Sequence, residues 1–100
     1  MDPEQPDFII SDVVLSTTGR NQGKIFYVIG MEGDYLLLAN GKDRSLDKPK
    51  RKKRKHVQKV LRSETRVAGK IRLGDKVLNG ELRRDLAFLA RQMQDTNLGG

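Results

Sequence analysis

The chain has 100 residues, with 20 Lys and Arg against 13 Asp and Glu, a net charge of +7 and a hydrophobic share of only 36%; this allows one domain with a small core. With no Cys and one His, it lacks the side chains for a disulfide framework, a thiolate metal site or a Cys nucleophile. No apolar run is long enough to cross a bilayer and no signal pattern opens the chain, so the composition favours a cytoplasmic binding module over an enzyme.

The first part of the chain predicts an arm followed by a small barrel. Residues 1–7 contain two Pro and three acids, which predicts a disordered N-terminal arm. β-Branched and aromatic residues then predict five short strands. These strands cover residues 12–16, 24–31, 35–39, 42–46 and 56–61. Five strands at such close spacing predict a small barrel within residues 8–62.

Two turns stand out between these strands. Residues 17–23 contain two Gly and an Asn, which is typical of a turn. Asn40 and Gly41 favour a two-residue type I′ hairpin, in which both residues have positive φ. Gly19, Gly23, Asn40 and Gly41 are therefore expected to serve as structural turn residues.

The C-terminal part predicts helices that cover the barrel. The strand at 24–31 is apolar on both faces, so a further element must cover one of them. A helical turn is predicted around residues 66–73, with Gly74 as its stop. A second helix should start at Asn79 or Gly80, because an apolar stripe at helical spacing follows. The stripe consists of Leu82, Leu86, Leu89 and Met93.

We expect this helical extension to span residues 63–95 and to pack on the barrel, with a frayed tail at 96–100. Phe88 lies off the stripe and is expected to be exposed, where it would suit a small contact surface for another protein.

Most of the positive charge lies in one segment. Residues 42–62 hold eleven cations and two anions, a net charge of +9, whereas the other 79 residues hold nine cations and eleven anions. Residues 50–55 are six consecutive cations, which repel one another unless a polyanion neutralises them. Phosphates are the usual neutralising groups. We therefore predict a basic loop at 47–56 that binds nucleic acid; cations beside His56 oppose a metal ion there.

The turn at 19–24 is the second candidate contact. Gly19 and Gly23 let the backbone turn tightly and expose peptide N–H groups, while Arg20 and Lys24 flank the turn with positive charge. Such a turn can hold a phosphate backbone. The alternative is an ordinary strand connection, in which glycine only supplies positive φ.

The order of these features resembles a known family. Residues 13–15, the GRNQGK turn at 19–24, the apolar strand and the YLLL segment at 35–38 resemble the KOW motif, which occurs in SH3-like barrels of ribosomal proteins and transcription elongation factors. With the NGK hairpin and the KPKRKKRKH block included, residues 12–61 resemble the bacterial KOW-domain RNA-binding proteins. Those are similar to a large-subunit ribosomal protein of archaea and eukaryotes, of the fourteen-e type.

The resemblance implies a mainly β fold: a five-stranded SH3-like barrel that binds RNA, most of all ribosomal RNA, and carries no catalytic residues. We expect a monomeric, cytoplasmic, ribosome-associated protein that also touches ribosomal proteins, with no cofactor, metal, membrane or small-molecule substrate. The expected RNA contacts are Arg20, Asn21, Gln22, Gly23, Lys24, Lys42, Arg44, Lys48, Lys50, Arg51, Lys52, Lys53, Arg54, Lys55 and His56.

The manner of recognition follows from these side chains. Arg51 and Arg54 can fork onto paired phosphate oxygens, which Lys cannot. Recognition should be of shape rather than of sequence, as structured RNA requires. Tyr27 and Tyr35 could stack on bases, but with only five aromatic residues in the chain, packing in the core is favoured for both.

Other functions stay open. A protein-binding KOW module of the transcription machinery would bind its partner through barrel and helix, and a non-specific DNA or polyanion binder would show no preference for RNA. Residues 49–57 also have the form of a nuclear import signal. An anionic membrane surface is a weaker candidate, since the basic block has no apolar partners to insert. No catalytic triad, metal-ligand spacing or nucleotide-binding loop appears.

Overall fold

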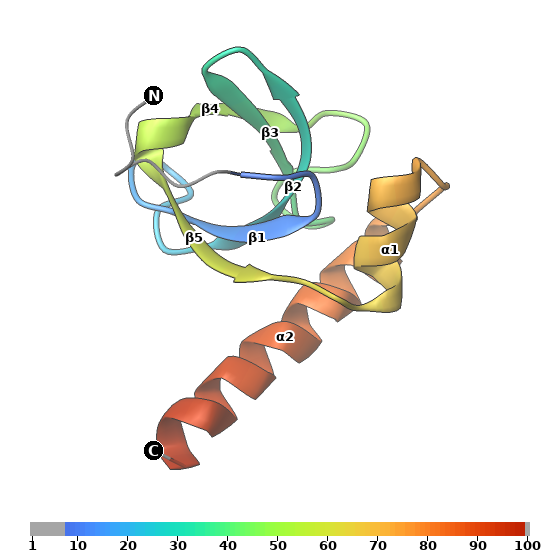
Figure 1. Ribbon diagram of the computed structural model, residues 1–100. Helices are drawn as coiled ribbons and strands as arrows, with labels where there is room; N and C mark the ends of the chain where they lie inside the picture. Colours follow the sequence, from blue (N-terminus) through green and yellow to red (C-terminus); the bar gives the residue numbers. More distant parts are fainter. Residues whose placement is uncertain (1–7, 100) are drawn as a thin grey trace.

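The computed structural model describes residues 8–99, which form one antiparallel sheet followed by two helices (Figure 1). The sheet has the order β4-β3-β2-β1-β5. Its strands are β1 (Asp12–Ser16), β2 (Ile25–Glu32), β3 (Tyr35–Ala39), β4 (Lys50–Lys53) and β5 (Val57–Arg62). A 3₁₀ turn, η1 (Arg54–His56), joins β4 to β5, and α1 (Arg66–Leu73) and α2 (Asn79–Gly99) follow. The predicted mainly β fold with a C-terminal helical part is confirmed.

The sheet is strongly curled and remains open. Strands β4 and β5 form its two opposite edges, yet only the three residues of η1 separate them along the chain. The two edges must therefore approach each other at that end. The register shifts between Val13 and Val14 and between Val28 and Gly30, and such bulges bend and twist a sheet. No ladder joins β4 to β5, so the sheet does not close.

The predicted strand at 42–46 is wrong, because Asn40 closes a different turn. Its side-chain Oδ1 accepts hydrogen bonds from the backbone N–H groups of Lys42, Asp43 and Arg44, at 3.0, 2.9 and 3.1 Å. An Asn that bonds the backbone ahead of it forms an Asx turn, and it occupies the donors that a strand would need. Gly41 has a φ of 77°, whereas Asn40 does not share this positive φ, so the type I′ hairpin is not formed.

The predicted basic loop at 47–56 is also wrong from residue 50 onward. Its centre is β4, which pairs with β3 so that Leu36 lies opposite Lys52 and Leu38 opposite Lys50. Its end is η1. The other four strands agree with prediction to within one residue at each end.

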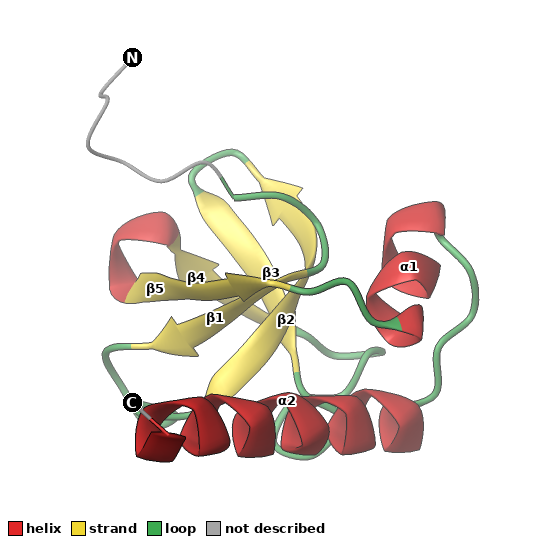
Figure 2. Cartoon of the chain, turned by 60° about the horizontal axis from the view of Figure 1, so that its bottom comes forward, coloured by secondary structure: helices red, strands yellow, loops and turns green. Residues whose placement is uncertain are grey.

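Two apolar clusters occupy the two faces of the sheet. The first lies inside the curl and consists of Phe8, Val14, Phe26, Val28, Leu36, Leu38 and Val57. The second joins the outer face to the helices and consists of Val13, Tyr27, Ala39, Ala68, Leu82, Leu86 and Leu89. Figure 2 shows α2 lying along this outer face. The prediction that the C-terminal segment covers the second face of β2 is thus confirmed. Phe88 lies off the buried stripe and is 51% exposed, as predicted.

Local signals set the helix ends. Helix α1 begins after Thr65, whose Oγ1 accepts a hydrogen bond from the Ala68 N–H at 3.2 Å, and it ends at Gly74, which has a φ of 75°. Both ends of α1 and the start of α2 at Asn79 agree with the prediction. Helix α2 runs on to Gly99, past the expected end at residue 95. The expected arm at 1–7 lies outside the described residues.

A buried polar cluster ties the sheet to both helices. The Tyr27 hydroxyl donates to the Asp85 carboxylate in α2 and lies 2.8 Å from Ser63 Oγ and 3.2 Å from Thr65 Oγ1. Thr65 Oγ1 donates to the same carboxylate at 2.9 Å. Burial, followed by the hydrogen bond to Asp85, raises the pKa of Tyr27 to about 12. The phenol therefore stays protonated and fixes α2 to β2.

Candidate nucleic-acid interface

Residues 50–56, which we call the basic edge, comprise β4 and η1. Strand β4 pairs only with β3 and so forms one edge of the sheet. In both ribbon views this edge lies away from α2 (Figures 1 and 2). The first four cations of the run are therefore held on a strand, where the side chains have fixed directions, and the last two lie in η1.

Strand alternation divides these cations between two faces, because successive side chains point to opposite sides of a sheet. Arg51 and Lys53 lie opposite Leu37 and Tyr35. The Arg51 guanidinium sits 4.3 Å from the centre of the Tyr35 ring, and the Lys53 ammonium 5.9 Å from it. Arg51 also pairs with Glu32 at 3.1 Å, but both side chains are more than half exposed, so this pair is weak. The stacked Arg51 and Tyr35 form a flat cationic surface.

Lys52 points the other way and is buried, with 8% of its surface exposed. Its ammonium donates to the backbone oxygen of Thr18 at 2.5 Å, and a Cβ placed on Gly19 would lie 3.3 Å from it. Burial, with the charge of Lys50 second, lowers the pKa of Lys52. Lys52 thus holds the turn at 17–24 against the edge and does not present its charge to solvent.

Four cations of the basic edge have no described acidic partner: Lys50, Lys53, Arg54 and Lys55. Within residues 8–94 no carboxylate lies at ion-pair distance from any of them. Arg54 instead lies over the Phe8 ring, with its guanidinium 5.9 Å from the ring centre. Uncompensated charges this close together create a positive potential that attracts anions.

The turn at 17–24 packs against the basic edge. The backbone N–H and the hydroxyl of Thr17 both donate to the backbone oxygen of His56, at 3.0 and 2.8 Å. With the Lys52 contact, this places the turn beside the basic edge. Arg20 and Gln22 are exposed on the turn, whereas Asn21 is 9% exposed and offers little of its side chain to a ligand.

The turn does not expose the expected row of peptide N–H groups. Gly19 and Gly23 have φ values of 82° and 88°, as glycines in a tight turn should. The N–H groups of Gln22, Gly23 and Lys24, however, donate to the backbone oxygens of Gly19, Ser16 and Asn21. These three N–H groups are therefore not free to bind a phosphate, because the turn uses them itself.

Four of the predicted RNA contacts lie outside the basic edge: Lys24, Lys42, Arg44 and Lys48. Lys24 pairs with Asp43 at 2.7 Å, and this contact, with a second hydrogen bond from Asn40, lowers the pKa of Asp43. Lys24 and Lys42 line a groove beside α2 rather than the basic edge. Arg44 is half-buried and Lys48 exposed in the connection at 40–49.

Other classes of site find no support in the described part of the chain. Within it, no three His, Asp or Glu side chains gather as a metal site would require, and none of its helices combines the length and apolar character of a membrane span. No protein-family model and no curated protein matches the chain. Function is therefore inferred from the residues and their geometry.

Three features of this surface were not predicted from the sequence. The Arg51–Tyr35 stack and the burial of Lys52 both follow from the alternation of a strand, whereas Arg51 and Lys52 were expected in a loop. The contact between Thr17 and His56 spans 39 positions, and no local signal in the sequence indicates it.

Proposed function

We propose that the protein binds RNA through the basic edge and the adjoining turn at 17–24. The observation that carries this proposal is the group of four cations on one strand edge, Lys50, Lys53, Arg54 and Lys55, without a described carboxylate at ion-pair distance. The surrounding segment, 42–62, has a net charge of +9. The closely spaced negative charges of a phosphate backbone can neutralise these closely spaced cations.

We further propose that the curled sheet belongs to the SH3-like barrels and that the protein is of the KOW type. The strand order β4-β3-β2-β1-β5, with η1 joining the two edges directly, supports this assignment. So does the glycine turn between β1 and β2. Ribosomal RNA is the proposed target because the KOW resemblance points to ribosomal proteins.

In this mechanism cations supply affinity and the sheet supplies orientation. Lys50, Lys53 and Lys55 would contact single phosphates, while Arg54 can fork onto two oxygens. The guanidinium of Arg51, stacked on Tyr35, offers a flat face for an unpaired base. Phosphate contacts fix position without reading bases, so the protein should recognise RNA shape.

The direct test uses a charge-neutralised variant with Lys50, Lys53, Arg54 and Lys55 all changed to Gln. Its affinity for a labelled RNA hairpin, measured across a salt series, should fall about a hundredfold or more at 0.15 M salt, and the slope of log K against log salt should fall by about 3. A matched control changes four exposed cations outside the edge to Gln. These are Arg66, Lys76, Arg84 and Arg91.

The two variants have the same net charge, so only the position of the cations differs. Equal losses in both would make the attraction a property of net charge and would overturn the assigned surface. Equal affinity of the native protein for the RNA hairpin and for a DNA duplex of the same stem sequence would make it a general polyanion binder.

The ribosomal target has its own test. The tagged native protein should sediment with large ribosomal subunits from a lysate at low salt, and the neutralised variant should move to light fractions. Sedimentation of the native protein in light fractions alone, while it still binds the RNA hairpin, would contradict the ribosomal target and leave RNA binding intact.

A further inference from the structure

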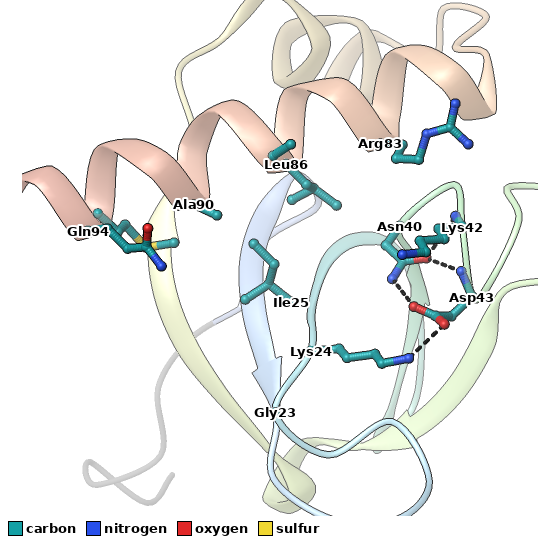
Figure 3. A pocket seen from close by; sticks show the side chains of 12 residues that line it. Gly23, Lys24, Ile25, Asn40, Lys42, Asp43, Arg83, Leu86, Ala90 and Gln94 are labelled. Atoms are coloured by element: carbon teal, nitrogen blue, oxygen red, sulfur yellow. Dashed lines mark hydrogen bonds and ion pairs between the residues drawn. The ribbon is translucent and has the colours of Figure 1, made fainter.

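A groove of about 490 Å³ lies between α2 and the segments 23–25 and 40–43 (Figure 3). One wall is α2, whose small side chains Ala87 and Ala90 line the groove. The opposite wall is the start of β2 and the Asn40 turn. The aliphatic lining consists of Ile25, Leu86, Ala87, Ala90 and Met93.

The polar rim of this groove is cationic. Lys24, Lys42 and Arg83 line it with one carboxylate, Asp43. Lys24 pairs with Asp43 at 2.7 Å, so these two charges compensate each other. For Lys42 and Arg83, no carboxylate within residues 8–94 lies at ion-pair distance. With three cations and one carboxylate in its lining, the groove combines an apolar floor with a net positive rim.

The walls of the groove are fixed before any ligand binds. The Asn40 side chain accepts three backbone N–H bonds and donates to Asp43. Asn79, the first residue of α2, accepts the Leu46 N–H at 2.8 Å. These bonds hold the turn against the helix. A preformed site loses less ordering entropy on binding, which suits a short flexible ligand.

We propose that this groove binds a short acidic and aliphatic peptide segment of another protein. Aliphatic side chains of the segment would lie between Ile25 and Ala90, and a neighbouring Asp or Glu would pair with Arg83 or Lys42. An RNA base fits less well, because the lining contains no aromatic ring to stack on and the Asn40 amide is already occupied. The protein would then join a partner protein to the RNA held at its basic edge.

The test is selection of peptides from a displayed library of random 12-residue segments on the full-length protein. Selected sequences should share Asp or Glu next to Leu, Ile, Val or Met. Synthesised versions should bind Arg83→Glu and Ala90→Trp at least tenfold more weakly than the native protein, in fluorescence polarisation. Arg84→Glu is the matched control, since Arg84 is exposed beside Arg83 but does not line the groove, and its affinity should stay within twofold.

Each other outcome overturns the proposal. A library that yields no shared sequence, or peptides that bind Arg83→Glu and Ala90→Trp as well as the native protein, would show that the groove is not the site. Displacement of a selected peptide by the RNA hairpin, with loss of RNA affinity in Ala90→Trp, would assign the groove to RNA. Binding of this chain's own sequence, with a concentration-dependent rise in mass, would make the occupant a second copy. Because RNA affinity is measured separately, failure here leaves the RNA proposal standing.

Discussion

The basic edge and the face of the sheet under α2 differ in how their side chains are paired and buried. Under α2, Leu82, Leu86 and Leu89 are buried, and no buried side-chain polar atom in the described chain lacks a hydrogen-bond partner. At the basic edge, four cations have no described carboxylate partner, and only Lys52 is buried. Like charges at close range destabilise a fold. The cations of the basic edge therefore lower the stability of the protein, while the same charges would attract an anionic ligand. Mutations in the two regions should therefore affect different measurements.

The largest effect on stability should come from the covered face. Leu82 is fully buried, and Leu82→Ala should lower the free energy of unfolding by about 3 kcal/mol through lost burial and a cavity. Urea denaturation measures this loss. RNA affinity, measured where the variant is folded, should stay within twofold.

The control for this change is Leu73→Ala. Leu73 is 79% exposed at the end of α1, so its truncation should change stability by less than about 0.5 kcal/mol. Equal losses in the two variants, or a tenfold loss of RNA affinity in Leu82→Ala, would mean that stability and binding are not separated in this way.

The contact between the Asn40 turn and α2 gives the next prediction. A Cβ on Gly41 would lie 2.1 Å from the backbone oxygen of Asn79, at a φ of 77°. Gly41→Ala should therefore cost about 2–3 kcal/mol in thermal or urea unfolding. Gly33→Ala shares the positive φ, 58°, but has nothing within 4 Å, so it should cost only about 1 kcal/mol. Similar costs would show that backbone conformation, and not the approach of the helix, decides the result.

The Tyr27 cluster tests how polar groups stabilise the covered face. Tyr27→Phe removes the hydroxyl that donates to Asp85. The half-buried carboxylate then loses one hydrogen-bond partner, which should cost about 1–2 kcal/mol.

Alkaline pH gives the same cluster a separate signature. The pKa of Tyr27 is about 12 when folded, against about 10 in an unfolded chain. The folded state keeps the Tyr27 proton to a higher pH than the unfolded state does. The stabilisation that the protonated hydroxyl provides is therefore complete below pH 10 and is lost as pH rises towards 12. The free energy of unfolding of the native protein should fall more steeply over this range than that of Tyr27→Phe. Parallel curves for native and Tyr27→Phe would contradict the cluster.

The sequence predicted the elements whose causes are local. The αL conformation of Gly74 ends α1, and the stripe at 82, 86 and 89 faces the sheet, because glycine and helical spacing act within a few residues. The strand expected at 42–46 is absent because the Asn40 side chain bonds the backbone of Lys42, Asp43 and Arg44, although an Asn–Gly pair favours a hairpin. Asn79 also accepts the Leu46 N–H from 33 positions away, and no local pattern indicates that partner.

The basic run failed for a different reason. Six like cations hide the period of two that would mark a strand, so the candidate site could be placed in the sequence but its two faces could not. The set of cations was predictable, whereas the division into exposed Arg51, half-buried Lys53 and buried Lys52 required the pairing with β3.

That division gives the smallest and most discriminating prediction, since two adjacent lysines of the basic edge should behave differently. Lys53→Met should weaken RNA binding about fivefold at 0.15 M salt, as the loss of one phosphate contact does. Lys52→Met should leave RNA affinity within twofold, because its ammonium is bonded to Thr18 and shielded from a ligand.

Stability should also separate the two lysines. Burial lowers the pKa of Lys52, so folding opposes its charge, and Lys52→Met removes that penalty together with one hydrogen bond of about 1 kcal/mol. The free energy of unfolding should then change by no more than about 1 kcal/mol, since the two effects oppose each other. A fivefold loss of RNA affinity in both variants would mean that Lys52 leaves Thr18 and contacts the RNA. Lys52 would then belong to the cations that bind RNA and not to those that hold the turn.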